Sequence, residues 1–191
     1  MKYCILALTL ISFLSCKDEV LPKPSAQLRL DYPEATYRIA NLPLPFMFQQ
    51  NSLSKAIEDV RLNEQNKSVG INIKYPTQKA TIHLTYKPIK DDLIDLLRDT
   101  QNFTQKHTIK ADEILSEFYE NKEERVFGML YEVNGNAASQ AQFYLTDSIN
   151  HFLSGSLYFY AKPNYDSLYP AVEYLKKDVK KLIETLRWRD P

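Results

Sequence analysis

The chain has 191 residues, of which 44% are hydrophobic and 25% are charged, a composition ordinary for a globular protein. Lysine plus arginine and aspartate plus glutamate each number 24, so the formal net charge is zero, and no basic excess indicates a nucleic-acid-binding protein. The four glycines include no pair close enough to form a phosphate-binding loop.

The first residues are typical of a lipoprotein leader. Lys2 precedes an apolar run over residues 4–14, which is shorter than the roughly 20 residues that a membrane-spanning helix requires. Ser15 and Cys16 follow and resemble a bacterial lipobox, in which the cysteine is acylated, with palmitate-type chains, and becomes the mature N-terminus. We predict a signal peptide over residues 1–15 and a lipid anchor on Cys16. An ordinary signal peptide with an incidental cysteine is the alternative.

Residues 16–50 are predicted to form the lipid anchor and a proline-rich tether, because proline disfavours helix and extends the backbone. Five of the ten prolines fall there, namely Pro22, Pro24, Pro33, Pro43 and Pro45. Lys17-Asp18-Glu19 is similar to the signal that sends some Bacteroidetes lipoproteins to the cell surface, although a solvated linker start explains it equally well. Apolar residues between positions 37 and 48 indicate where the tether docks. We place a single domain at residues 51–191.

Alternation of apolar and polar residues predicts six strands. They cover residues 69–75, 80–86, 110–119, 126–133, 139–145 and 152–160. Residues 52–66 have a mixed pattern that fits a surface helix or a loop.

Two helices are predicted from apolar residues at helical spacing. The first covers residues 91–104, with Asp91 as its cap. The second runs from residue 166 or 167 to residue 186, with an unbroken apolar stripe made of Leu168, Val172, Leu175, Val179, Leu182 and Leu186. Its other side is predicted to be solvated, with Glu173 paired to Lys177 and with the lysines Lys176, Lys177, Lys180 and Lys181.

The order of these elements predicts an α+β fold. Short links favour antiparallel neighbours, so we expect an antiparallel sheet of about six strands with both helices packed on one face. The element order resembles that of PsbP- or Mog1-like domains, a likeness that says little about function.

The polar side of the last two strands is the predicted partner interface, because exposed tyrosines are good binding anchors. Its residues are Gln140, Gln142, Tyr144, Tyr158 and Tyr160. No metal site and no cofactor are predicted.

Catalysis is not expected. The best case for a hydrolase combines Asp147 and Ser148 with His83, His107 or His151, but no Gly-x-Ser-x-Gly or His-Glu-x-x-His motif occurs. Thr146-Asp147-Ser148 is more simply a turn whose side chains cap backbone groups.

Several segments resemble the gliding motility lipoprotein GldD family of the Bacteroidetes. They include Asn-Ile-Lys-Tyr-Pro at residues 72–76, Ile-His-Leu-Thr-Tyr-Lys at 82–87, Gly-Met-Leu-Tyr-Glu-Val-Asn-Gly at 128–135 and Phe-Leu-Ser-Gly-Ser-Leu-Tyr-Phe at 152–159. The resemblance spans nearly the whole chain from Cys16 to Trp188.

The resemblance implies a non-catalytic lipoprotein that supports gliding motility and, indirectly, type IX secretion. Such a protein stabilises or assembles other gliding components, with a GldJ-like lipoprotein as the expected partner. It is attached to the cell envelope through its lipid, on the periplasmic side or at the outer membrane. Of the family's residues, only the lipidated cysteine, here Cys16, carries over. The alternative is an envelope lipoprotein that binds glycan or peptidoglycan by aromatic stacking.

Overall fold

A computed structural model describes residues 30–40, 42–55, 57, 60–65, 67–105, 111–160 and 165–189. The predicted signal peptide, the lipid attachment at Cys16, the Lys17-Asp18-Glu19 signal and His107 lie outside the described residues. The structure therefore bears on the folded body and not on its anchor.

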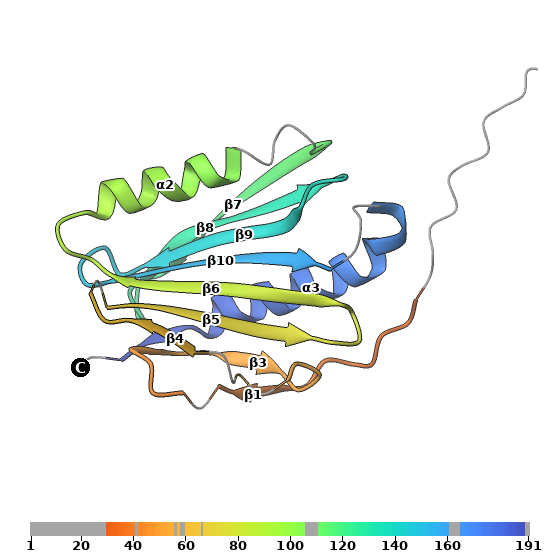
Figure 1. Ribbon diagram of the computed structural model, residues 1–191, viewed down its shortest axis with the longest axis horizontal. Helices are drawn as coiled ribbons and strands as arrows, with labels where there is room; N and C mark the ends of the chain where they lie inside the picture. Colours follow the sequence, from red (N-terminus) through yellow and green to blue (C-terminus); the bar gives the residue numbers. More distant parts are fainter. Residues whose placement is uncertain are drawn as a thin grey trace, which may run out of the picture.

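A seven-stranded antiparallel sheet forms the centre of the molecule (Figure 1). Its order is β4 (Val60–Asn63), β5 (Ser68–Tyr75), β6 (Ala80–Pro88), β10 (His151–Phe159), β9 (Ser139–Thr146), β8 (Val126–Asn134) and β7 (Glu113–Asn121). The α+β class and the six predicted strands are confirmed. The seventh strand, β4, lies where a helix or a loop was predicted. All four of its residues are exposed, so it carries no alternating pattern that would indicate a strand.

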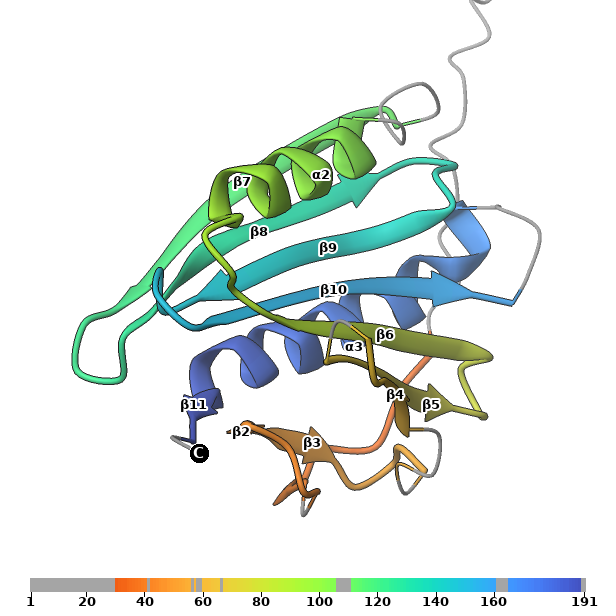
Figure 2. The ribbon, with the colours of Figure 1, turned by 60° about the vertical axis from the view of Figure 1, so that its left-hand side comes forward.

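The two helices lie on opposite faces of the sheet, so the prediction that both pack on one face is wrong. Figure 2 shows α2 (Leu93–Gln105) in front of the sheet and α3 (Tyr165–Thr185) behind it. Helix α2 contacts the side that carries Gln142, whose Oε1 lies 2.9 Å from the Thr104 hydroxyl. An apolar stripe shows that a helix is half-buried, but it does not show which face of the sheet the helix covers.

The core lies between α3 and the apolar face of the sheet. The predicted apolar stripe is confirmed, with Val172 and Leu175 of α3 and Leu186 directly after it fully buried. Leu175 and Leu186 belong to one core cluster with alternate strand residues such as Leu153 and Leu157. Each aliphatic side chain so buried stabilises the fold by about 1.5–3 kcal/mol, so α3 and the sheet depend on each other.

The segment before residue 51 belongs to the folded body, so the boundary predicted at residue 51 falls inside it. Strand β1 (Tyr37–Ile39) pairs with β3 (Gln49–Asn51), and β2 (Phe46–Met47) pairs with β11 (Arg187–Trp188) near the C-terminus. Phe46 and Phe48 are 1% exposed and lie in the core. Apolar residues between positions 37 and 48 thus pack on the domain as predicted, although the predicted domain boundary excluded them.

A buried carboxylate joins this N-terminal segment to α3. Asp178 is 3% exposed, and its oxygens accept hydrogen bonds from Tyr37 Oη (2.8 Å) and from Asn51 Nδ2 (2.9 Å). Tyr75 of β5 also bonds to it. Burial raises the pKa of Asp178 above its ordinary value, although the three donors act in the opposite direction.

Part of the lysine-rich side of α3 is also buried, contrary to prediction. Lys176 is 5% exposed, and its Nζ lies 3.2 Å from Glu132 of β8 and 3.4 Å from Glu173. Glu173 thus pairs at i,i+3 rather than with Lys177. Lys180 reaches the same Glu132 at 2.8 Å. These ion pairs fix α3 against β8.

Replacement of Asp178 by alanine should lower the free energy of unfolding by about 3 kcal/mol, because each buried donor left without an acceptor costs about 1–3 kcal/mol. The raised pKa adds a pH dependence. The folded chain binds the Asp178 proton more tightly than the unfolded chain does. The stability that comes from this tighter proton binding is therefore complete below about pH 4 and is lost as the pH rises through the folded pKa.

Urea unfolding at several pH values measures both effects, with Lys177→Ala on the exposed side of α3 as a control expected within about 0.5 kcal/mol of the wild type. Asp178→Asn should flatten the pH dependence. An unchanged free energy in Asp178→Ala, or an unchanged pH profile in Asp178→Asn, would contradict the assignment.

Candidate functional site

The face of the sheet opposite α3 carries the candidate site. Its polar residues come from alternate positions of β5, β6, β10 and β9, and α2 covers one part of it (Figure 2). We call it the polar face. It contains the predicted interface residues, but the structure separates them into buried and accessible groups.

Gln140 and Gln142 are each 2% exposed, so the prediction that they lie at the surface is wrong. Gln140 Nε2 donates to the backbone oxygens of Gly135 (3.1 Å) and Ala137 (2.9 Å) and so holds the turn before β9. Gln142 lies beneath α2 beside Thr104. Strand alternation alone did not indicate that a helix covers this side of β9.

The three tyrosines remain partly or fully accessible but do not form one patch. The ring of half-buried Tyr144 stacks on Phe152, at 5.8 Å between centroids. Tyr158 lies edge-on to His83. Tyr160, 65% exposed, places its hydroxyl 2.8 Å from Thr81 Oγ1. Tyr144 pairs opposite Ser154, about 13 Å along β10 from Tyr158 at 3.3 Å per residue.

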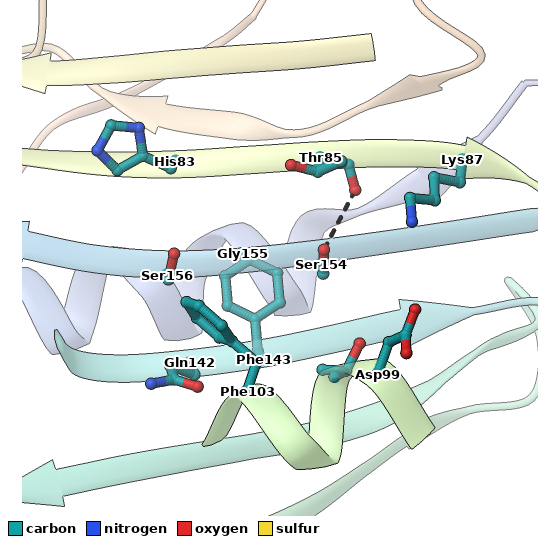
Figure 3. Close-up of a pocket in the computed structure, with 11 residues that line it drawn as sticks. His83, Thr85, Lys87, Asp99, Phe103, Gln142, Phe143, Ser154, Gly155 and Ser156 are labelled. Carbon is teal, nitrogen blue, oxygen red and sulfur yellow. Dashed lines mark hydrogen bonds between the residues drawn. The ribbon is translucent and has the colours of Figure 1, made fainter. Parts of the chain in front are cut away.

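A cleft of about 260 Å³ opens between α2 and the polar face (Figure 3). Its floor is made of strand side chains from β6, β9 and β10, and α2 forms one wall. The lining groups that carry hydrogen-bonding or aromatic chemistry are His83, Thr85, Lys87, Asp99, Thr100, Phe103, Gln142, Phe143, Ser154 and Ser156. A second hollow of about 360 Å³ over β4, β5 and β6 shares His83 and Thr85 with it.

The floor of the cleft is low where β10 places two small residues, Ser154 and Ser156, on the polar face. Ser154 and Ser156 rise little above the polar face, and Gly155 between them has no side chain. A Cβ at Gly155 would lie 2.3 Å from the ring of Phe143, which fills the space on the apolar side. Two serines at alternate positions of a core strand are therefore the sequence signal for this cleft, and the contrast of apolar and polar residues alone does not indicate it.

His83 is not a solvated surface histidine. With the Asn72 amide oriented so that its oxygen accepts from Arg61 (3.0 Å), the Asn72 nitrogen donates to His83 Nδ1 (2.7 Å). This bond fixes the neutral tautomer with its proton on Nε2. Burial, and to a lesser extent the positive charge of Arg61, lower the pKa of His83. The imidazole is therefore an uncharged hydrogen-bond donor at neutral pH.

Asp147 and His151, two of the groups considered for hydrolysis, are used in structural contacts. Asp147 Oδ1 accepts from the backbone nitrogens of Ile149 (3.0 Å), Asn150 (2.8 Å) and His151 (2.8 Å), which confirms the predicted turn. His151 Nδ1 lies 2.9 Å from the Tyr86 hydroxyl, and its ring stacks on Trp188.

These features define a small α+β protein with a polar cleft. Within the part of the chain that the structure describes, no three metal-binding side chains gather, and no helix is long and apolar enough to cross a membrane.

The family profile of the gliding motility lipoprotein GldD matches residues 17–188, nearly the whole chain. The chain therefore belongs to the GldD family of gliding motility lipoproteins, as the sequence resemblance predicted. It is accordingly a lipid-anchored protein of the cell envelope, and its family is tied to motility rather than to a reaction. Comparison with curated proteins and with solved structures found no match, so the likeness to PsbP and Mog1 domains stays a prediction.

The assignment of His83 is testable by titration. We expect its NMR-detected protonation midpoint to lie below 6.5, the ordinary value, because burial and Arg61 both disfavour the charged ring. Arg61→Gln removes one of these causes and should raise the midpoint part of the way back. A midpoint at or above 6.5 in the wild type would show that the ring is solvated, and no change in Arg61→Gln would contradict the contribution of Arg61.

Proposed function

We propose that this protein is a non-catalytic envelope lipoprotein, acylated at Cys16, that supports gliding motility by stabilising or assembling other gliding components. The observation that carries the proposal is the family match over residues 17–188. Its effect on type IX secretion is indirect, through the components that it stabilises. A GldJ-like lipoprotein is the proposed partner, and the body stands on the periplasmic side or at the outer membrane.

The proposed contact surface is the accessible part of the predicted interface. Tyr160 at the end of β10 is 65% exposed, and Tyr158 lies two residues before it, half-buried against His83. A tyrosine offers a large rigid ring and a hydroxyl at low entropic cost, which suits a binding anchor. Gln140 and Gln142 are buried and so lie outside this surface, and Tyr144 lies about 13 Å along β10 from Tyr158.

The anchor is tested by Cys16→Ser. Without the thiol no thioether to lipid can form, so we expect loss of palmitate labelling, release of the protein from the membrane fraction and loss of spreading motility. Cys4→Ser is the matched control, because this cysteine lies inside the predicted signal peptide. Membrane-bound, labelled Cys16→Ser protein would contradict the proposed attachment.

The contact surface is tested by the double substitution Tyr158→Ala with Tyr160→Ala, introduced into the full chain. Loss of two anchors should cost about 2 kcal/mol or more of binding free energy, which lowers the abundance of the GldJ-like partner and reduces spreading. Ile94→Ala removes another exposed apolar side chain, 72% exposed on α2, and should have no effect. Normal motility and partner abundance at wild-type levels of the double variant would refute this surface.

A further inference from the structure

The cleft beneath α2 has a lining that the proposed partner contact does not use. On one wall Lys87 lies near the end of β6, and on the other Asp99 and Phe103 project from α2 (Figure 3). Among the described residues, neither Lys87 nor Asp99 makes an ion pair or a side-chain hydrogen bond. Two opposite charges thus face the same space without neutralising each other directly.

The lining combines donors and acceptors. Lys87 only donates and ionised Asp99 only accepts, whereas the hydroxyls of Thr85 and Ser156 do both. The charges of Lys87 and Asp99 cancel, so the cleft attracts neither anions nor cations strongly. A matching ligand has no net charge and carries groups that both donate and accept, as alcohols do.

Phe103 adds an aromatic surface to this polar cleft. Its side chain is 43% exposed although it is large and apolar. Sugar rings present C–H groups on their faces and hydroxyls on their edges, so a ring packed on Phe103 directs its hydroxyls at polar neighbours. Few other neutral ligands of this size have both surfaces.

We propose that the cleft between α2 and the polar face binds a neutral saccharide, with one sugar ring packed against Phe103 and its hydroxyls bonded to Asp99 and Lys87. The cleft of about 260 Å³ takes a single ring. The adjoining hollow of about 360 Å³, reached past His83, takes a neighbouring unit of a longer glycan. His83 lines both hollows. This site goes beyond the contact of the tyrosines with a partner protein.

The test is titration of the purified full-length protein, in a detergent without a sugar headgroup, with cellotriose and with the N-acetylglucosamine trimer. Amide NMR shifts report binding, and a dissociation constant of about 1 mM or tighter is expected for at least one of them, in the range of a small polar ligand. The shifts should fall on Ser154, Ser156 and residues 99–103. Polygalacturonate, an anionic glycan, should bind more weakly.

Phe103→Ala and Asp99→Asn should each weaken binding at least tenfold. Phe118→Ala is the matched control, because Phe118 is 63% exposed on edge strand β7. Asp99 is at the surface, so Asp99→Asn should leave the fold intact. It therefore tests the site even if Phe103→Ala unfolds the protein. The proposal is overturned by the absence of shifts at 10 mM of either trisaccharide, by binding that both cleft variants retain, or by stronger binding of polygalacturonate. Saccharide binding is measured on the purified protein, whereas the partner contact is tested by the spreading motility of the variant Tyr158→Ala with Tyr160→Ala. Failure of one proposal therefore leaves the other untouched.

Discussion

The packing of α3 on one face of the sheet decides how the rest of the molecule is arranged. Leu175, Val179 and Leu182 bury the apolar rows of the strands, and Asp178 on the same helix binds the N-terminal segment. Because strand side chains alternate, the same strands must present their other residues on the opposite face. That face is polar, which allows it to serve as a binding surface built on rigid strands rather than on loops.

The periodicity of apolar residues in the sequence was sufficient to predict the strands and helices that bury only one side. The strands around residues 69–75 and 80–86 and the stripe of α3 were predictable because each contrasts a buried with an exposed face. Strand β9 is buried on both faces, so its glutamines look exposed although α2 and a turn cover them. Strand β4 has no buried side, so its sequence shows no alternation of apolar and polar residues.

The candidate site was predictable in its location but not in its shape. The polar face was identified from alternation, and Tyr160 is exposed as expected. The cleft was missed because its residues come from β6, α2, β9 and β10, which only the folded chain brings together. Asp178 was missed for the same reason: an acidic residue in a helix is usually solvated, and its three donors come from distant parts of the chain.

Membership of the GldD family places this body on a lipid anchor in the envelope, and we propose that the exposed end of β10 touches another gliding protein there. The most direct test is photo-crosslinking in living cells with benzoylphenylalanine at position 160 and, for comparison, at position 94. We predict an adduct from position 160 that disappears in cells lacking the GldJ-like lipoprotein, and none from position 94. No adduct from position 160 in gliding cells, or equal adducts from both positions, would contradict the account.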